Sequence, residues 1–166
     1  MDAMNALIFG KFAPLHYGHV YLIQTALDQS QPQDRVYVLV SENPELDIDP
    51  SKVRAQWITE SICDPRLIVI PTGEFPPSGR SAAAQQANFR YMCQQIPDGV
   101  VIHKVYCNEW YGEHIARDFQ AEWVQIDPQR SRYPISATQI RTEPHRYEDF
   151  LPPHIHKHYK KVNTKP

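Results

Sequence analysis

The segment GKFAPLHYGHVYLI, residues 10–23, brings together three side chains that bind anions. Lys11, His16 and His19 lie within nine residues, and Gly18 stands between the two histidines. A helix that begins near Gly18 directs its free N–H groups and the positive end of its dipole toward the same point. The spacing therefore predicts a site for a polyphosphate, in which the lysine and both histidines supply positive charge and Gly18 admits the ligand to the backbone. The structural alternative is that His16 caps the helix, His19 packs on it and Lys11 is solvated.

The segment PISATQIR, residues 134–141, offers a second set of anion-binding groups. Ser136 and Thr138 flank the expected start of a short helix, whose N–H groups would face an anion. Arg141 follows five residues after Ser136, and its planar fork suits phosphate oxygens. Taken alone, the segment also fits an ordinary capped helix with an exposed arginine. The phosphate interpretation depends on its meeting residues 10–23 in the fold.

Short apolar runs that alternate with helical stretches must position these two segments. We expect strands at 6–9, 35–40, 66–70, 100–107 and 122–126, and helices at 19–29, 51–62, 81–96 and 112–120. Ser51 is the expected N-cap of the second helix. The alternation predicts one α/β domain over residues 1–166: a doubly wound, Rossmann-like parallel sheet of about five strands with helices on both faces. In such sheets ligands bind at the carboxyl ends of the strands, where residues 10–23 begin.

Composition narrows the classes of partner. The formal net charge of −2 argues against a nucleic-acid or membrane-surface binder, and no apolar run has membrane-spanning length. Cys63, Cys93 and Cys107 show no C-x-x-C pairing and are expected to be reduced, mostly buried thiols of a cytoplasmic protein. The P-loop motif is absent. The oligomeric state stays open, a homo-oligomer included.

The two segments together resemble the nucleotidyltransferase superfamily, with H-x-G-H near the N-terminus and I-S-x-T-x-x-R near the C-terminus. More narrowly, GKFAPLHYGHVYLI, VRAQW and DPQRSRYPISATQIRTEPHRYEDFLP are similar to the adenylyltransferase domain of NadR proteins. The resemblance implies transfer of AMP from ATP to nicotinamide mononucleotide, giving NAD and pyrophosphate. Mg²⁺ would arrive with the triphosphate, as it usually does, rather than in a protein metal site.

The resemblance also implies roles for individual residues. Four catalytic residues are expected: Lys11, His16, His19 and Arg141. The expected ATP-binding residues are Gly10, Phe12, Gly18, Asn108, Arg130, Ser136 and Thr138. For the acceptor, Arg54 matches a family position and is the candidate for its phosphate. Phe75 is the first candidate for an aromatic face, with Glu74 beside it; Trp57 is another, although its helical spacing also favours the core.

The chain departs from the NadR pattern in residues 74–92, EFPPSGRSAAAQQANFRYM, where the family typically carries tryptophans. Two alternatives therefore stay open: an adenylyl- or cytidylyltransferase for another phosphorylated acceptor, and a nucleotide-sensing module without turnover. Near the C-terminus, His154, His156 and His158 follow two prolines. A helix there would point residues two apart to different sides, which predicts a solvated basic helix rather than a metal site.

Overall fold

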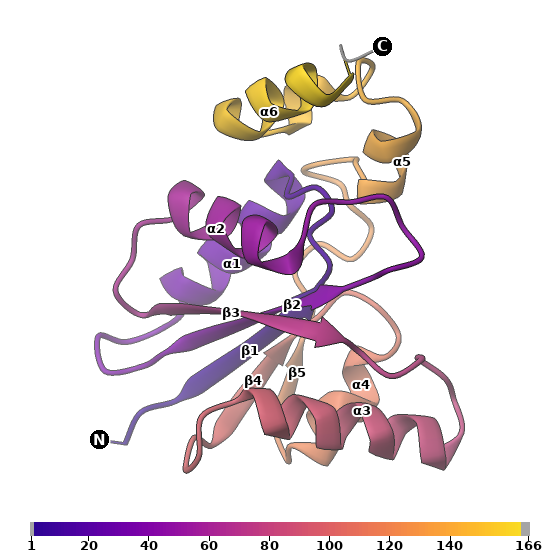
Figure 1. Cartoon of the computed structure of the whole chain (residues 1–166). Helices are drawn as coiled ribbons and strands as arrows, with labels where there is room; N and C mark the ends of the chain where they lie inside the picture. Colours follow the sequence, from indigo (N-terminus) through magenta and orange to yellow (C-terminus); the bar gives the residue numbers. More distant parts are fainter. Residues whose placement is uncertain (1, 164–166) are drawn as a thin grey trace.

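The computed structural model describes residues 2–163 as a parallel five-stranded sheet between layers of helices. The strands are β1 (Asn5–Gly10), β2 (Val36–Glu42), β3 (Leu67–Glu74), β4 (Ile102–Tyr106) and β5 (Glu122–Val124). Their order is β3-β2-β1-β4-β5, and every neighbouring pair is parallel (Figure 1). The predicted fold class is confirmed. The order reverses between β1 and β4, the place where this fold binds ligands.

Helices cover both faces of the sheet. On one face lie α1 (Tyr17–Asp28) and α2 (Ser51–Ser61), and on the other α3 (Ala82–Gln95) and α4 (Gly112–Asp118) (Figure 1). After β5 the chain forms α5 (Ala137–Thr142), η1 (Glu148–Phe150) and α6 (Pro153–Asn163) on the α1–α2 side. No helix of the described residues is long and apolar enough to cross a membrane.

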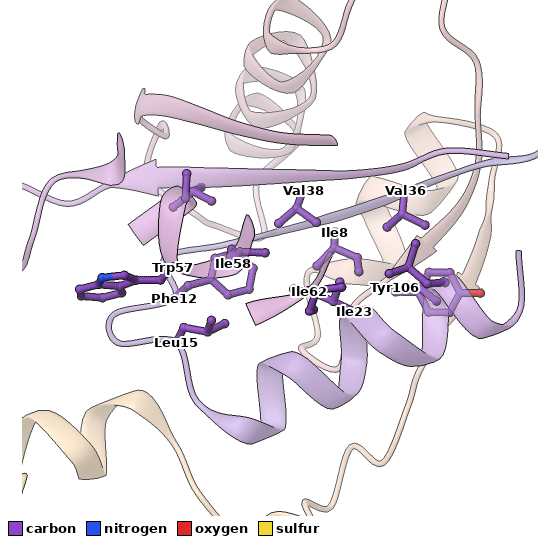
Figure 2. Close-up of a cluster of buried hydrophobic side chains, with 14 of the residues drawn as sticks. Ile8, Phe12, Leu15, Ile23, Val36, Val38, Trp57, Ile58, Ile62 and Tyr106 are labelled. Atoms are coloured by element: carbon purple, nitrogen blue, oxygen red, sulfur yellow. The ribbon is translucent and has the colours of Figure 1, made fainter. Parts of the chain in front are cut away.

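Residues of the central strands alternate between two hydrophobic cores. Ile8 and Val38 pack toward α1 and α2, where they meet Ile23 and Ile58 (Figure 2). The neighbouring strand residues, Leu7 and Leu39 among them, join the core under α3 and α4. Because both faces are covered, these strands read as continuous apolar runs in the sequence. The prediction of mostly buried thiols is wrong for Cys63 and Cys93, which are exposed; Cys107 is buried.

Two local expectations at the ends of elements are corrected. Pro50, not Ser51, is the N-cap residue of α2, and no side chain caps it. The Ser51 hydroxyl instead donates to the carbonyl of Thr72 at 2.9 Å, which ties α2 to β3. β3 continues through Pro71 to Glu74 rather than ending at residue 70. An edge strand tolerates a proline, and β3 lies at the edge of this sheet.

The sequence predicted that the histidines of α6 are solvated, but in the structure each of them contacts another side chain. His156 lies 2.9 Å from a carboxylate oxygen of Glu148, and His158 lies 3.0 Å from one of Asp49. His154 is 3.3 Å from the Ser61 hydroxyl. The three rings thus contact three different elements, because alternate residues of a helix point to different sides. Side chains after residue 158 lie outside the described part of the chain.

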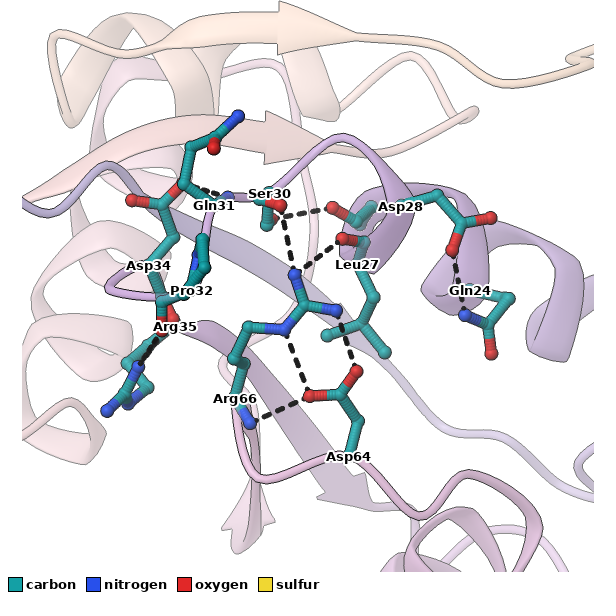
Figure 3. A network of polar contacts seen from close by, with 11 residues as sticks. Gln24, Leu27, Asp28, Ser30, Gln31, Pro32, Asp34, Arg35, Asp64 and Arg66 are labelled. Carbon is teal, nitrogen blue, oxygen red and sulfur yellow. Dashed lines mark hydrogen bonds and ion pairs between the residues drawn. The ribbon is translucent and has the colours of Figure 1, made fainter.

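A partly exposed polar network closes the end of α1 that is remote from the carboxyl edge of the sheet. The Arg66 guanidinium donates to the carbonyls of Leu27 and Ser30, in the last turn of α1 and just after it, at 3.0 and 2.9 Å (Figure 3). Asp64 accepts from Arg66 Nε and Nη2 at 3.0 and 2.7 Å. These hydrogen bonds hold the pKa of the Asp64 carboxyl at about 2.

Substitution Arg66→Ala should lower the free energy of unfolding by about 1–3 kcal/mol, because it removes the guanidinium hydrogen bonds to the Leu27 and Ser30 carbonyls and to the Asp64 carboxylate. Urea unfolding measures the change. Arg35→Ala is the matched control, since among the described residues the Arg35 guanidinium bonds the nearby carbonyls of Pro32 and Asp34. Equal losses in both variants would show that the network adds nothing beyond a surface arginine.

Candidate active site

A cavity of about 460 Å³ opens at the carboxyl ends of β1 and β4. One wall, called here the α1–α5 wall, is formed by residues at the start of α1 and by residues of α5 and its N-cap: His16, Gly18, His19, Ser136, Thr138 and Arg141. The opposite wall, called the α3–α4 wall, comes from the other face of the sheet: Phe9, Phe75, Ser78, Asn88, Met92, Tyr111, His114 and Ile115. The cavity therefore spans both faces at the point where the strand order reverses.

Two stacked imidazoles form the cap of α1. His16 Nδ1 accepts from the backbone N–H groups of Gly18 and His19 at 3.0 and 3.3 Å, and His19 Nδ1 accepts from the N–H of His16 at 3.2 Å. The ring centroids are 3.7 Å apart. This is a capping box built from histidines instead of Ser and Glu. The capping role that the sequence offered as the alternative is therefore present, and because each Nδ1 accepts, a neutral ring must carry its proton on Nε2.

These two histidines are neutral at physiological pH in the ligand-free protein. Burial, with a smaller contribution from Arg130, lowers the pKa of His16 to about 3. Burial, the neighbouring His16 ring and Arg130 lower the pKa of His19 well below its usual value. The expectation that both supply positive charge is wrong for this state. They offer Nε2–H donors instead, and a bound polyphosphate would raise both pKa values.

Gly18 is required by the cap itself. A Cβ at this position would lie 2.8 Å from Cε1 and 3.0 Å from Nδ1 of His16. The ring that accepts the Gly18 N–H thus occupies the space that a side chain would need. The sequence predicted that Gly18 lets a ligand approach the backbone. The structure shows a separate need for glycine here, because the His16 ring leaves no room for a side chain.

Two arginines hold the loop between β1 and α1. Arg54 is 0% exposed; it donates to the carbonyls of Lys11 and Asp49 and pairs with Glu42 at 3.3 Å. From the other side, Arg141 Nη1 donates to the carbonyl of Ala13 at 2.6 Å. The loop backbone is therefore fixed at Lys11 and at Ala13. Arg54 acts on this loop from behind, outside the cavity wall.

Neither Arg54 nor Trp57 lines the cavity, so the structure does not support their predicted contact with an acceptor. Arg54 points into the protein because its guanidinium is used by the loop and by Glu42. Trp57 is buried in the core, with its ring edge-on to that of His158 at 5.5 Å. Phe75 does line the cavity, and its ring lies 6.5 Å from Phe9 and 5.1 Å from Tyr91.

The second predicted segment meets the first on the α1–α5 wall. Ser136 caps α5 in a capping box with Gln139: its Oγ accepts from the Gln139 N–H at 3.2 Å. Thr138 Oγ1 lies 3.2 Å from Arg141 Nη2. The bond from Arg141 to Ala13 spans 128 residues of sequence. Residues 10–23 and 134–141 therefore meet in the fold, as the phosphate interpretation required.

The remaining predicted ATP-binding residues also line the cavity: Gly10, Phe12, Asn108 and Arg130, together with the catalytic candidate Lys11. The Asn108 side chain bonds the backbone of Ile126 twice: Nδ2 donates to the carbonyl and Oδ1 accepts from the N–H, each at 2.8 Å. Phe12 has a positive φ of 51° and packs edge-on against His19 with centroids 4.9 Å apart. Arg130 pairs with Glu109 at 3.6 Å. Their contacts with ATP stay predictions.

Several cavity residues were not singled out from the sequence: Tyr21, Asn88, Tyr111, His114 and Tyr133. Asn88 lies in a helix rich in alanine and glutamine, which gave no signal. Arg132, which precedes the second segment, lies over the ring of Tyr21 at 5.1 Å rather than at the cavity.

The chain belongs to the cytidylyltransferase-like family, whose model matches residues 7–143 and so contains both segments of the α1–α5 wall. More particularly, it is similar to the trifunctional NAD biosynthesis/regulator proteins NadR of Escherichia coli K12 and Salmonella typhimurium LT2. The identities are 28% and 25%, over 90% of this chain and 39% of each relative. The structure of a NadR protein in complex with NAD and AMP-PNP shares the fold, with a TM-score of 0.63 at 20% identity, covering 90% of this chain and 45% of that one. The chain thus spans about two-fifths of the curated relatives it matches.

The lowered pKa of His16 makes stability depend on pH. The folded state keeps the ring neutral down to about pH 3, whereas the unfolded chain takes up a proton near pH 6.5. Stability from this group is therefore present above about pH 6.5 and is lost as pH falls toward about 3. His16→Asn keeps an N-cap residue but removes this titration, so its unfolding free energy should fall less than that of wild type between about pH 7 and about pH 4.5.

Denaturant unfolding across this pH range measures the slope. His145→Asn is the matched histidine-to-asparagine control, because His145 is exposed and takes no part in the cap of α1. A His16→Asn slope as steep as that of wild type would contradict the assignment of a neutral, capping His16.

Proposed function

We propose that this chain transfers AMP from ATP to nicotinamide mononucleotide and releases pyrophosphate. The observation that carries the proposal is the α1–α5 wall, where neutral imidazole donors from one segment and Arg141 from the other converge on one cavity. Membership of the cytidylyltransferase-like family supports nucleotidyl transfer, and the similarity to NadR proteins supports the choice of substrates.

The reaction joins the two phosphates directly. A phosphate oxygen of the acceptor attacks the α-phosphorus of ATP, a new P–O bond forms, and the bond from the α-phosphorus to the bridging oxygen breaks. Pyrophosphate leaves with that electron pair, and no covalent enzyme intermediate is needed. Catalysis then consists of positioning the two phosphates and stabilising the charge on the transferring and leaving oxygens.

Two kinds of protein group act on the triphosphate: neutral hydrogen-bond donors and positively charged side chains. His16 and His19 donate from Nε2 to triphosphate oxygens, because their Nδ1 atoms are held by the backbone of α1. Lys11 and Arg141 contribute positive charge from the loop and from α5. Pyrophosphate departs next to these groups, where its negative charge is neutralised.

The carboxylates on the cavity are not arranged as a metal cage. Asp127 accepts from the N–H groups of Ser131 and Arg132 at 2.9 and 2.8 Å, and Glu109 faces Arg130. Among the described residues no group of three or more His, Cys, Asp or Glu side chains is placed to hold a metal ion. These residues fit a Mg²⁺ ion that is carried by the triphosphate oxygens and neutralises charge on them.

A second function keeps the chemistry and changes the acceptor. Residues 74–92 lack tryptophan, and the exposed Trp110 near this segment is covered by the Arg80 guanidinium, 4.2 Å above its ring. This arrangement favours a cytidylyl- or adenylyltransferase for another phosphorylated acceptor. The α3–α4 wall instead supports the mononucleotide, because Phe9, Phe75 and Tyr111 offer aromatic surface to a pyridinium ring.

Pyrophosphate release across a matrix of ATP or CTP and several phosphorylated acceptors tests the proposal. We expect release with ATP and nicotinamide mononucleotide in the presence of Mg²⁺. Release with another acceptor only would identify the second function. Tight nucleotide binding without release in any combination would indicate a sensing module.

His19→Ala should lower kcat about 10²–10³-fold, the usual effect of removing one donor to transition-state charge. His145→Ala, at an exposed position, should keep wild-type turnover. Thermal unfolding of both variants shows whether loss of the His19 cap contact alters folding. A folded His19→Ala protein with near-normal turnover would reject the assigned role.

A further inference from the structure

His114 is a buried histidine on the cavity that the phosphate chemistry does not use. It lies on α4, is 6% exposed and forms part of the α3–α4 wall. Its Nδ1 is sealed from solvent and has no hydrogen-bond partner among the described residues. A buried polar atom in this condition requires an explanation, because a buried polar group without a partner loses its hydration and gains no hydrogen bond in exchange.

The surroundings of His114 indicate which ring nitrogen carries the proton. Burial lowers the pKa of His114, so the ring is neutral near pH 7. A proton on the sealed Nδ1 would be an orphaned donor, which proteins tolerate less often than an unpaired acceptor. The Nε2 atom is not sealed in this way. His114 thus presents an Nε2–H donor on the cavity side.

Asn88 complements this donor with a fixed acceptor. It is also 6% exposed, lies on α3 and lines the same wall. Its Nδ2 donates to the carbonyls of Pro77 and Ala84 at 3.2 and 3.0 Å, which uses both amide hydrogens. A flipped amide would place its oxygen against these two carbonyls. The Oδ1 atom is therefore held as an acceptor, and the described residues give it no partner.

The rest of the α3–α4 wall carries no charge. Its other members are apolar or hydroxyl-bearing side chains: Phe9, Phe75, Ser78, Met92, Tyr111 and Ile115. The charged residues of the cavity come from other segments: Lys11, Glu109, Asp127, Arg130 and Arg141. A negatively charged ligand group at this wall would lose its hydration and gain no cation in return.

We propose that His114 and Asn88 determine acceptor specificity by recognising a carboxamide. The His114 Nε2–H donates to the carboxamide oxygen, and Asn88 Oδ1 accepts from its NH₂ group. This inference rests on the proposed function, since it identifies how the acceptor's ring substituent is read. A carboxylate in the same place would direct an oxygen at Asn88 Oδ1 and bring a negative charge to a wall without a cation.

Two acceptors that differ only in this substituent test the inference: nicotinamide mononucleotide and the same mononucleotide with a carboxylate. With ATP fixed, wild type should show a kcat/KM for the amide at least about tenfold above that for the acid, as expected where a site's polar groups would otherwise stay unpaired. This comparison needs no variant and so does not depend on folding.

His114→Leu removes the donor while keeping an apolar body of similar size. The KM for the amide should rise about tenfold, with the KM for ATP and kcat nearly unchanged, and the ratio of amide to acid should fall by about the same factor. His114→Gln is the matched variant, because its side-chain NH₂ reaches near the position of the imidazole Nε2. It should keep most of the wild-type ratio.

Each other outcome has a distinct meaning. Wild type that favours the acid, or a His114→Leu ratio equal to that of wild type, overturns the inference and leaves nucleotidyl transfer in place. An equal loss for both acceptors and for ATP shows that His114 only supports the fold, which also overturns it. Wild type that releases pyrophosphate with neither mononucleotide rejects the proposed substrate, and this inference with it.

Discussion

The free N–H groups at the start of α1 are satisfied by two imidazole rings, and the geometry of the site follows from this one arrangement. His16 Nδ1 accepts from the N–H groups of Gly18 and His19, and His19 Nδ1 accepts from the N–H of His16. These bonds fix both rings and leave both Nε2 atoms as donors. The same bonds explain Gly18, whose missing side chain makes room for the His16 ring. Groups that stabilise the helix are thus also the groups that meet the ligand. A change at either histidine therefore affects the cap and the chemistry together.

The loop in front of this cap is held from opposite sides by Arg54 and Arg141. Arg54 pairs with Glu42 of β2 and donates to the carbonyl of Asp49, which precedes α2. A third contact, with the carbonyl of Lys11, links the loop to both of these segments. Arg141 comes from α5, which has only six residues and would be marginal by itself. Its capping box and the bond to Ala13 fix it against the N-terminal segment. The C-terminal third of the chain thereby completes a cavity that the first helix begins.

The sequence predicted the sheet and the meeting of the two segments because both depend on strong local signals. Alternating apolar strands and helices indicate a parallel sheet, and such a sheet brings the ends of its strands to one edge. It did not predict that Arg54 faces inward, since helical spacing shows which residues share a face but not which partner that face meets. For Trp57, the core position that its spacing favoured is the one present. It also assigned charge to His16 and His19, whose burial is a tertiary property. Asn88 and His114 gave no signal of their own, because an amide or imidazole becomes informative only when its neighbours are known.

The central claim is that neutral, backbone-held imidazoles present Nε2–H donors to a polyphosphate. Long-range ¹H–¹⁵N correlation spectra of the histidine rings at neutral pH test it most directly, recorded with and without a non-hydrolysable ATP analogue, with His16→Asn used to assign the signals. Both rings should be Nε2–H tautomers in the free protein, and their Nε2 signals should shift when the analogue is added. Imidazolium or Nδ1–H signals from these rings in the free protein, or Nε2 signals that the analogue leaves unmoved, would contradict it.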